Sequence, residues 1–107
     1  MTSPDFIVLT TTHDDQDAAR ALAASLVGER LAACAQVYPV ESVYWWDGAV
    51  RNATEWRIDL KTRADRADRL TARIAELHTY DTPEVVAVPV VTGSPSYLAW
   101  LAAETAG

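Results

Sequence analysis

The chain has few residues that bind metals or form cross-links. Cys34 is the single cysteine in 107 residues, so a disulfide within the chain is excluded, and a lone free thiol suits a reducing compartment. The only histidines are His13 and His78, and neither belongs to a CxxC or HxxxH motif. Such a sparse set of nitrogen and sulfur ligands argues against a closed zinc site formed by one chain.

The chain also lacks a long apolar run and an excess of basic residues. Residues 1–15 have neither the basic region nor the apolar stretch of a signal peptide, and no segment has the length of a membrane span. Nine basic and fifteen acidic residues give a net charge of -6, which repels nucleic-acid phosphates and anionic lipid surfaces. We therefore expect a soluble cytoplasmic protein that binds neither nucleic acid nor membrane.

A single domain covering residues 1–107 is expected from the length and from a hydrophobic content of 50%. A domain of this size buries roughly two-thirds of its unfolded surface, so contact between identical subunits would add useful burial. Hydrophobic spacing predicts alternating strands and helices. The expected strands are 6–11, 33–46, 49–62 and 85–91, and the expected helices are 14–30, 67–77 and a short one that begins at Ser94-Pro95.

The predicted order βαββαβ plus a terminal helix is typical of a ferredoxin-like α+β sandwich with a long central hairpin. Right-handed crossovers would place the first and third strands in the centre of the sheet and the second and fourth at its edges. Pro39 and Pro89 agree with this order, because proline cannot donate a ladder hydrogen bond and is tolerated mainly in edge strands. Asp47-Gly48 is expected to join the second and third strands in a type I′ turn.

Two features predict contact between subunits. Each hairpin arm of about 13 residues would span roughly 40 Å, more than a small sheet needs, and its tip carries Tyr44, Trp45 and Trp46. These aromatic side chains would form an exposed apolar patch in a monomer. The strand at 85–91 is apolar on both faces, whereas two helices can cover only one face of the sheet. A neighbouring chain is the simplest cover, although the C-terminal helix could also provide it.

Five motifs in one order carry a family resemblance. They are ERLAAC at 29–34, YWWDG at 44–48, Glu55 followed by Lys61-Thr62, LHTYDTPE at 77–84, and PVVTGSPSYLAWL at 89–101. In these motifs, which extend over nearly the whole chain, the sequence resembles the CutA divalent-cation tolerance family. The resemblance implies a tight homotrimer of ferredoxin-like subunits whose hairpins wrap around their neighbours. It also implies a role in tolerance of copper or other divalent ions.

The chain departs from this family pattern at three positions. Thr79 and Thr82 stand where family members usually have proline and an aliphatic residue, and Thr10 stands where some members carry a further cysteine. The segment at 77–84 is therefore more polar than the pattern, and the capacity for soft metal ions is lower.

A metal site is predicted at Cys34, His78 and Glu84. Cuprous ion prefers thiolate and thioether ligands, whereas cupric ion accepts imidazole and carboxylate. Because one chain offers so few donors, we expect copper or another divalent cation to bind weakly or at a site shared between chains. Two alternatives stay open: Cys34 as a small core residue, and His78 as a histidine that bonds to the last carbonyl groups of its helix.

The second prediction for this region is a cleft between subunits that binds a small molecule. Lys61, Tyr80 and Glu84 would line it, with His78 nearby and Pro83 holding the turn. The protein would then be a trimeric small-ligand sensor or signalling protein, similar in architecture to the PII trimers. Lys61 and Glu84 could instead form a buried structural ion pair.

Two further functions have less support in the sequence. His13, followed by Asp14 and Asp15, could bind a hard cation at the surface, but capping of the following helix is the better interpretation. Catalysis with His78 as general base and Glu84 as its orienting group would lack a nucleophile motif, a phosphate loop or a metal triad. We therefore expect no enzyme activity. A trimer that serves as a rigid platform for partner proteins is the remaining alternative.

Overall fold

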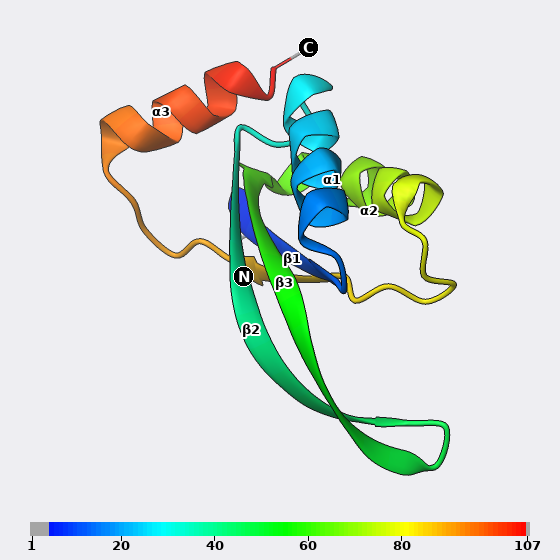
Figure 1. The fold of residues 1–107 in the computed structure, drawn as a ribbon. Coiled ribbons are helices and arrows are strands. Elements are labelled where there is room, and N and C mark those ends of the chain that lie inside the picture. Colours follow the sequence, from blue (N-terminus) through cyan, green and yellow to red (C-terminus); the bar gives the residue numbers. More distant parts are fainter. Residues whose placement is uncertain (1–4, 107) are drawn as a thin grey trace.

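In the computed structural model, which describes residues 5–106, a four-stranded antiparallel sheet carries three helices (Figure 1). The elements follow the predicted order: β1 (Phe6–His13), α1 (Gln16–Gly28), β2 (Cys34–Trp46), β3 (Ala49–Arg63), the 3-10 turn η1 (Ala64–Arg66), α2 (Ala67–Leu77), β4 (Val86–Pro89) and α3 (Pro95–Glu104). The strand order β2-β3-β1-β4 confirms that β1 and β3 are central. Pro39 and Pro89 accordingly lie in the two edge strands.

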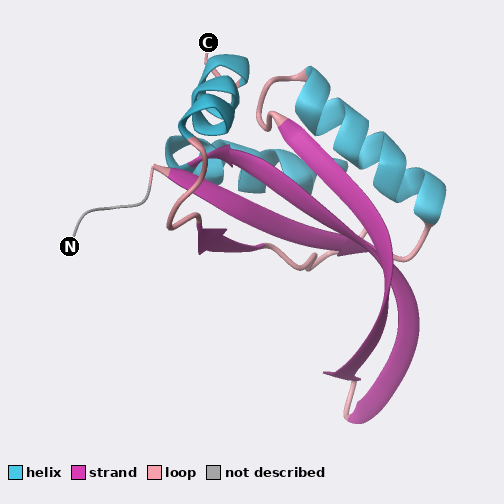
Figure 2. Ribbon diagram, turned by 90° about the vertical axis from the view of Figure 1, so that its left-hand side faces the viewer, coloured by secondary structure: helices cyan, strands magenta, loops and turns pink. Residues whose placement is uncertain are grey.

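The hydrophobic core lies between the sheet and the pair α1 and α2, on one side of the sheet (Figure 2). α1 begins where the Asp15 carboxylate accepts the backbone N–H of Ala18 at 2.8 Å. Apolar residues at three- and four-residue spacing then point to the sheet, and both helices meet the alternating apolar residues of β1 and β3. The buried apolar residues from these elements are Ile7, Leu9, Ala19, Leu22, Ala23, Leu26, Ile58, Leu60, Leu70 and Ile74.

The opposite face of the sheet is largely open in one subunit. β4 is shorter than the predicted strand at 85–91, and Val86 and Val88 are 57% and 58% exposed. α3 packs at one end of the sheet, where Leu101 is buried, and does not cover β4. The prediction that both faces of this strand are covered is therefore wrong for one chain, and cover by a neighbouring chain stays a prediction.

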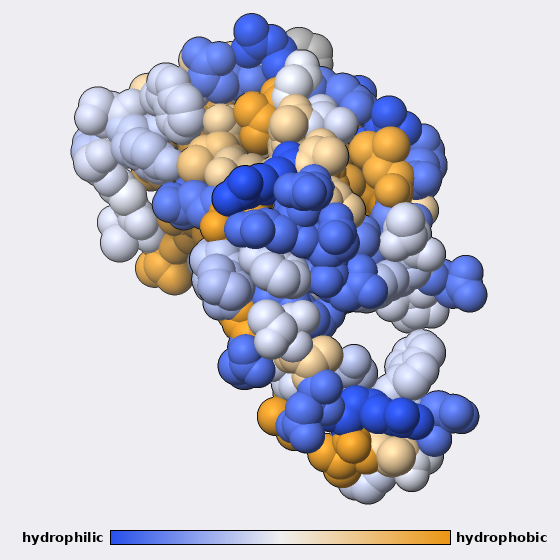
Figure 3. All heavy atoms as spheres, viewed as in Figure 1, coloured by the Kyte–Doolittle hydropathy of each residue, from blue (hydrophilic) through white to orange (hydrophobic). Residues whose placement is uncertain are grey.

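The hairpin of β2 and β3 extends beyond the rest of the sheet, as predicted (Figure 1). β1 pairs with β3 only from Trp56 to Arg63, so residues 49–55 pair with β2 alone. The connecting residues Asp47 and Gly48 both have positive φ, 49° and 75°, as a type I′ turn requires. At the far end of the hairpin, apolar (orange) and intermediate (pale) side chains lie on the surface (Figure 3).

The start of α3 agrees only in part with the start predicted from the sequence. Pro95 is in its first turn, and Ser94 occupies the N-cap position, but the Ser94 side chain makes no capping hydrogen bond. Within residues 5–106, no helix is long and apolar enough to cross a membrane.

Candidate functional site

A buried aromatic cluster lies where β1 and α2 both end. His13 is the last residue of β1 and His78 is the C-cap residue of α2. Their rings stack with centroids 4.6 Å apart and planes 16° apart. The ring of Tyr80 packs against both, with centroid distances of 5.5 Å to His13 and 4.5 Å to His78. The cluster thus joins the central strand, the second helix and the segment that follows it.

Both ring nitrogens of His78 are occupied by the protein itself. Nε2 lies 2.7 Å from the carbonyl oxygen of Thr12, and Nδ1 accepts the backbone N–H of Tyr80 at 3.1 Å. A carbonyl oxygen can only accept, so these bonds require the tautomer with its proton on Nε2. The ring therefore bonds to β1 rather than to the last carbonyl groups of its own helix, which was the alternative considered from the sequence.

His13 supports the start of α1 and is not a surface ligand. Its Nδ1 accepts the backbone N–H of Asp15 at 3.2 Å, and Asp15 caps the helix. The imidazole is buried, with 5% of the residue exposed. The capping interpretation is therefore confirmed for this segment. The alternative, a cation site at the surface, is wrong for His13 because this residue is buried.

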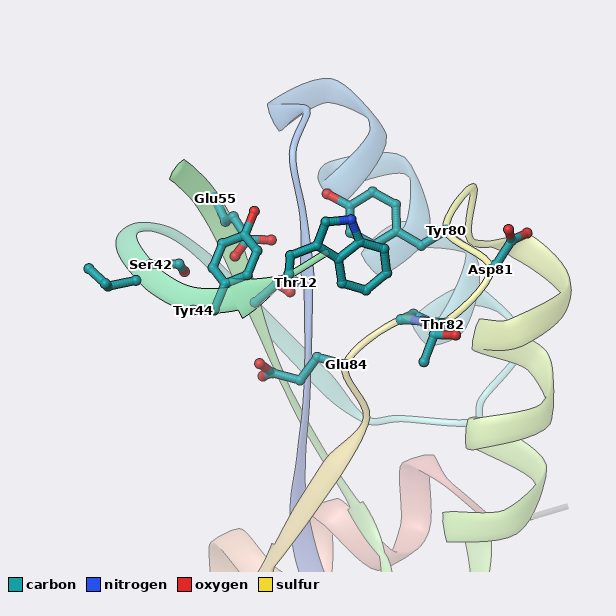
Figure 4. Close-up of a pocket in the computed structure, with 11 residues that line it drawn as sticks. Thr12, Ser42, Tyr44, Glu55, Tyr80, Asp81, Thr82 and Glu84 are labelled. Atoms are coloured by element: carbon teal, nitrogen blue, oxygen red, sulfur yellow. The ribbon is translucent and has the colours of Figure 1, made fainter. Parts of the chain in front are cut away.

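A cavity of about 700 Å³ lies between the hairpin and the segment after α2 (Figure 4). Figure 3 shows the same gap as an opening between the far end of the hairpin and the body. The lining comes from the end of β1, from the distal hairpin and from residues 80–84: Thr12, Ser42, Val43, Tyr44, Trp46, Glu55, Tyr80, Asp81, Thr82, Pro83 and Glu84. In Figure 4, Tyr44 and Tyr80 lie on opposite walls, and Asp81 is at the outer edge.

The lining of this cavity is acidic. Glu55, Asp81 and Glu84 belong to it, and no lysine, arginine or histidine from the described part of the chain does. Burial raises the pKa of Tyr80 from its ordinary value of 10.0 to about 12, with further contributions from the nearby carboxylates of Asp14 and Glu55. Tyr80 thus presents a neutral hydroxyl group to the cavity.

Comparison with known families agrees with the five sequence motifs. Residues 7–104 match the family described as CutA1 divalent ion tolerance protein. The chain belongs to the CutA1 family. The divalent-cation tolerance protein CutA of Pyrococcus horikoshii is 38% identical over 99 residues, which are 92% of this chain and 97% of that protein. The chloroplastic protein CutA 1 of Oryza sativa is 43% identical over 96 residues, which are 89% of this chain.

The chain spans about half the length of the two plant relatives, 54% of the rice protein and 53% of the one from Arabidopsis thaliana.

Solved CutA1 structures have the same fold. CutA1 from Oryza sativa superposes with a TM-score of 0.92 at 40% identity, covering 99% of this chain and 98% of that one. CutA1 from Pyrococcus horikoshii gives a TM-score of 0.91 at 37% identity, covering 94% and 99%. The α+β architecture with a four-stranded antiparallel sheet is thus that of CutA1 proteins.

Two of the three residues predicted to bind a ligand lie in the cavity of this CutA1 chain. Tyr80 and Glu84 line it, whereas Lys61 pairs with Val8 and Cys34 nearer the other end of the sheet. The Lys61 ammonium lies 5.5 Å from the ring centroid of Tyr97, a cation–π distance. Over residues 5–106 no ion pair joins Lys61 to Glu84, so the alternative of a structural pair between them is wrong within one subunit.

The predicted metal ligands of the CutA1 chain do not converge within one subunit. Cys34 of β2 pairs with Lys61 of β3, which in turn pairs with Val8 of β1. Val8 is four residues, or about 13 Å, along β1 from Thr12, whose carbonyl oxygen bonds to the His78 ring. Cys34 is half-buried and shares the open face with Lys61, so it does not fill the helical core. In the described part of the chain, no three His, Cys, Asp or Glu side chains are placed to hold a metal ion. A metal site shared between chains stays a prediction.

A polar network on the open face was not predicted from the sequence. Asp59 accepts hydrogen bonds from the hydroxyls of Thr10 and Tyr38 at 2.8 and 2.6 Å, and from Arg57 Nε at 3.1 Å. Burial alone would raise the pKa of Asp59, but these three hydrogen bonds outweigh it and hold the pKa below 3.8. Because Arg57 and Asp59 are two residues apart in β3, they lie on one face of the strand, but their partners on β1 and β2 depend on the register between strands.

Proposed function

We propose that this CutA1-family chain forms a homotrimer of ferredoxin-like subunits that binds copper or another divalent cation in the cytoplasm and contributes to divalent-ion tolerance. The observation that carries the proposal is the family match over residues 7–104. Relatives from Pyrococcus horikoshii and Citrobacter koseri are named divalent-cation tolerance proteins. The role is one of binding, without catalysis.

Surface that one subunit leaves uncovered supports assembly. Trp45 and its cross-strand partner Val50 near the hairpin tip are 74% and 53% exposed, and Val86 and Val88 are exposed on an edge strand. Exposed apolar side chains on a projecting ribbon and an unpaired strand edge favour packing against another chain. Each identical subunit presents the same exposed surface. In a closed ring, every subunit can bury this surface in the same way.

The positions of the donors support a cation site between subunits. Cys34 lies on the open face, and Glu84 lines a cavity beside the projecting hairpin. Both can be approached by a neighbouring chain, and thiolate and carboxylate are ligands that copper ions accept. His78 is buried with both nitrogens bonded, so its part is to hold Tyr80 and the cavity wall in place.

The test is isothermal titration of the metal-stripped protein with Cu²⁺ and with Zn²⁺, with the mass of the assembly measured by light scattering in the same buffer. We expect an assembly of about three times the 11.7 kDa subunit mass and saturable binding at a fixed ratio to it. Cys34→Ala or Glu84→Gln should weaken the binding of at least one ion by about tenfold, as expected on loss of a ligand.

Asp68→Asn is the matched control, because it removes an exposed carboxylate from the first turn of α2, outside the cavity. Weak uptake without fixed stoichiometry, or equal affinity in all variants, would reject the metal site. His78→Ala can be interpreted in this assay only if its circular dichroism and mass equal those of the parent protein.

The cavity favours a second function, that of a small-ligand sensor. Its volume of about 700 Å³ is in the range of small-molecule sites, and Tyr80 and Glu84 present a hydroxyl and a carboxylate to it. A thermal-shift screen in metal-free buffer tests this function, because a ligand that binds the folded state alone raises the melting temperature. The absence of any shift across charged and neutral metabolites would reject it.

A further inference from the structure

We propose that the cavity between the hairpin and residues 80–84 binds a small organic ammonium ion. This inference rests on the second function proposed above, a small-ligand site, and names the class of ligand. Three properties of the lining carry it: the sign of its charge, its aromatic side chains and the rigidity of one wall.

The charge of the lining selects for cations. Glu55, Asp81 and Glu84 are its charged residues, and all three are acidic. Arg57 lies close enough to interact electrostatically with Glu84, but its own charge is paired, since its Nε bonds to Asp59 at 3.1 Å. A small anion would meet uncompensated negative charge here, whereas a cation would gain Coulomb energy in a partly enclosed site.

Aromatic side chains make the cavity better suited to an organic cation than to a bare metal ion. Tyr44, Trp46 and Tyr80 contribute rings to the lining, and Tyr44 and Tyr80 stand on opposite walls (Figure 4). Ring faces attract ammonium groups within about 6 Å of the centroid, and cages of such rings recognise alkylated ammonium ions. Metal ions instead need converging donors, and the described residues offer no group of three.

The aromatic cluster of His13, His78 and Tyr80 holds one wall of the cavity in place before a ligand binds. The Tyr80 ring packs 4.5 Å from His78 and 5.5 Å from His13, measured between centroids. The bond from the Tyr80 backbone N–H to His78 Nδ1 fixes the main chain at the same point. A ring held in this way loses little side-chain entropy when a ligand binds, so more of the contact energy appears as affinity.

The experiment compares three probes of equal chain length by calorimetric titration of the assembled protein in metal-free buffer. They are butane-1,4-diamine, a dication; succinate, a dianion; and butane-1,4-diol, which is neutral. We expect saturable binding of the diamine, weaker at high salt, and no binding of succinate. Tetramethylammonium, which cannot donate hydrogen bonds, should also bind if the rings contribute.

Two sets of variants locate the binding. Glu84→Gln removes one carboxylate from the lining and should weaken diamine binding about five- to tenfold, whereas Asp68→Asn changes the net charge equally outside the cavity and should not. Trp46→Leu should weaken binding of tetramethylammonium more than Trp46→Phe does, because phenylalanine keeps a ring. Light scattering verifies that each variant keeps the assembly.

The outcomes separate this inference from the function on which it rests. Binding of succinate or butanediol without binding of the diamine would overturn the ammonium assignment and leave the small-ligand function standing. Equal losses in Glu84→Gln and Asp68→Asn would show general attraction by surface charge and overturn the site. No binding of any probe would overturn the ammonium proposal, and a screen without any shift would overturn the small-ligand function as well.

Discussion

His78 shows how one residue connects three parts of the chain. Its imidazole bonds to the Thr12 carbonyl group, accepts the Tyr80 N–H and stacks on His13. The sequence marked this histidine as a candidate metal ligand, and the contacts show instead a buried structural group that positions the wall of a cavity.

Replacement of His78 by alanine tests this structural role. We expect His78→Ala to lower the free energy of unfolding by about 2–4 kcal/mol, because it leaves two backbone groups without partners and a cavity beside His13. Urea denaturation at fixed subunit concentration measures the change. Thr71→Ala, at an exposed position of α2, should change it by less than about 0.5 kcal/mol. Equal effects of the two substitutions would contradict the role assigned to His78.

The hairpin is the element on which both the cavity and the proposed assembly depend. Its distal part pairs only with itself, so its register is fixed by the Asp47-Gly48 turn and by cross-strand pairs rather than by the core. Tyr44 and Trp46 on one arm and Glu55 on the other reach the cavity from this ribbon. A shift of one residue in the pairing would turn these side chains to the other face.

Gly48→Ala tests the turn. Gly48 has φ of 75°, a region in which a side chain costs about 1–2 kcal/mol, so the free energy of unfolding should fall by about that amount. Gly28→Ala is the matched control, since Gly28 ends α1 with no heavy atom within 4 Å of the position that a Cβ would occupy, and alanine is the better helix former. We expect it to be neutral or stabilising. A neutral Gly48→Ala would show that the turn does not need positive φ.

In the whole subunit, three of the four tryptophan side chains, those of Trp45, Trp46 and Trp100, lie partly or mostly exposed outside the core. Of the described tryptophans, Trp45 and Trp46 are mostly exposed, while Trp56 packs against the core. Trp100 on α3 is 42% exposed and lies 5.5 Å from Tyr97 between ring centroids. Burial of these side chains against another chain would stabilise the assembly through the hydrophobic effect. The same side chains contribute little to stability while they are exposed in a monomer.

Trp45→Ser therefore tests the proposed homotrimer. We expect the concentration at which the assembly dissociates to rise by about tenfold or more, because buried tryptophans commonly dominate interfaces. Sedimentation at a series of dilutions measures this concentration. Arg69→Ser removes a large exposed side chain from α2, on the helical side of the sheet and away from the hairpin tip (Figure 2), and should leave this concentration unchanged. A parent protein that stays monomeric at all concentrations would reject the assembly itself.

Local sequence patterns were enough to predict the order of the elements, the edge position of the strands with Pro39 and Pro89, the Asp47-Gly48 turn and the CutA1 family. The order of the elements and the turn follow from hydrophobic period and turn chemistry, which act over a few neighbouring residues. The edge positions follow from the handedness of the crossover connections, and the family was identified by the resemblance of five motifs. Contacts between distant residues became known only from the folded chain. Folding brought Tyr80 and Glu84 to one cavity, left Lys61 beside Tyr97, and placed Cys34 far along the sheet from His78. Such contacts depend on strand register and on the curvature of the hairpin, which no local pattern encodes.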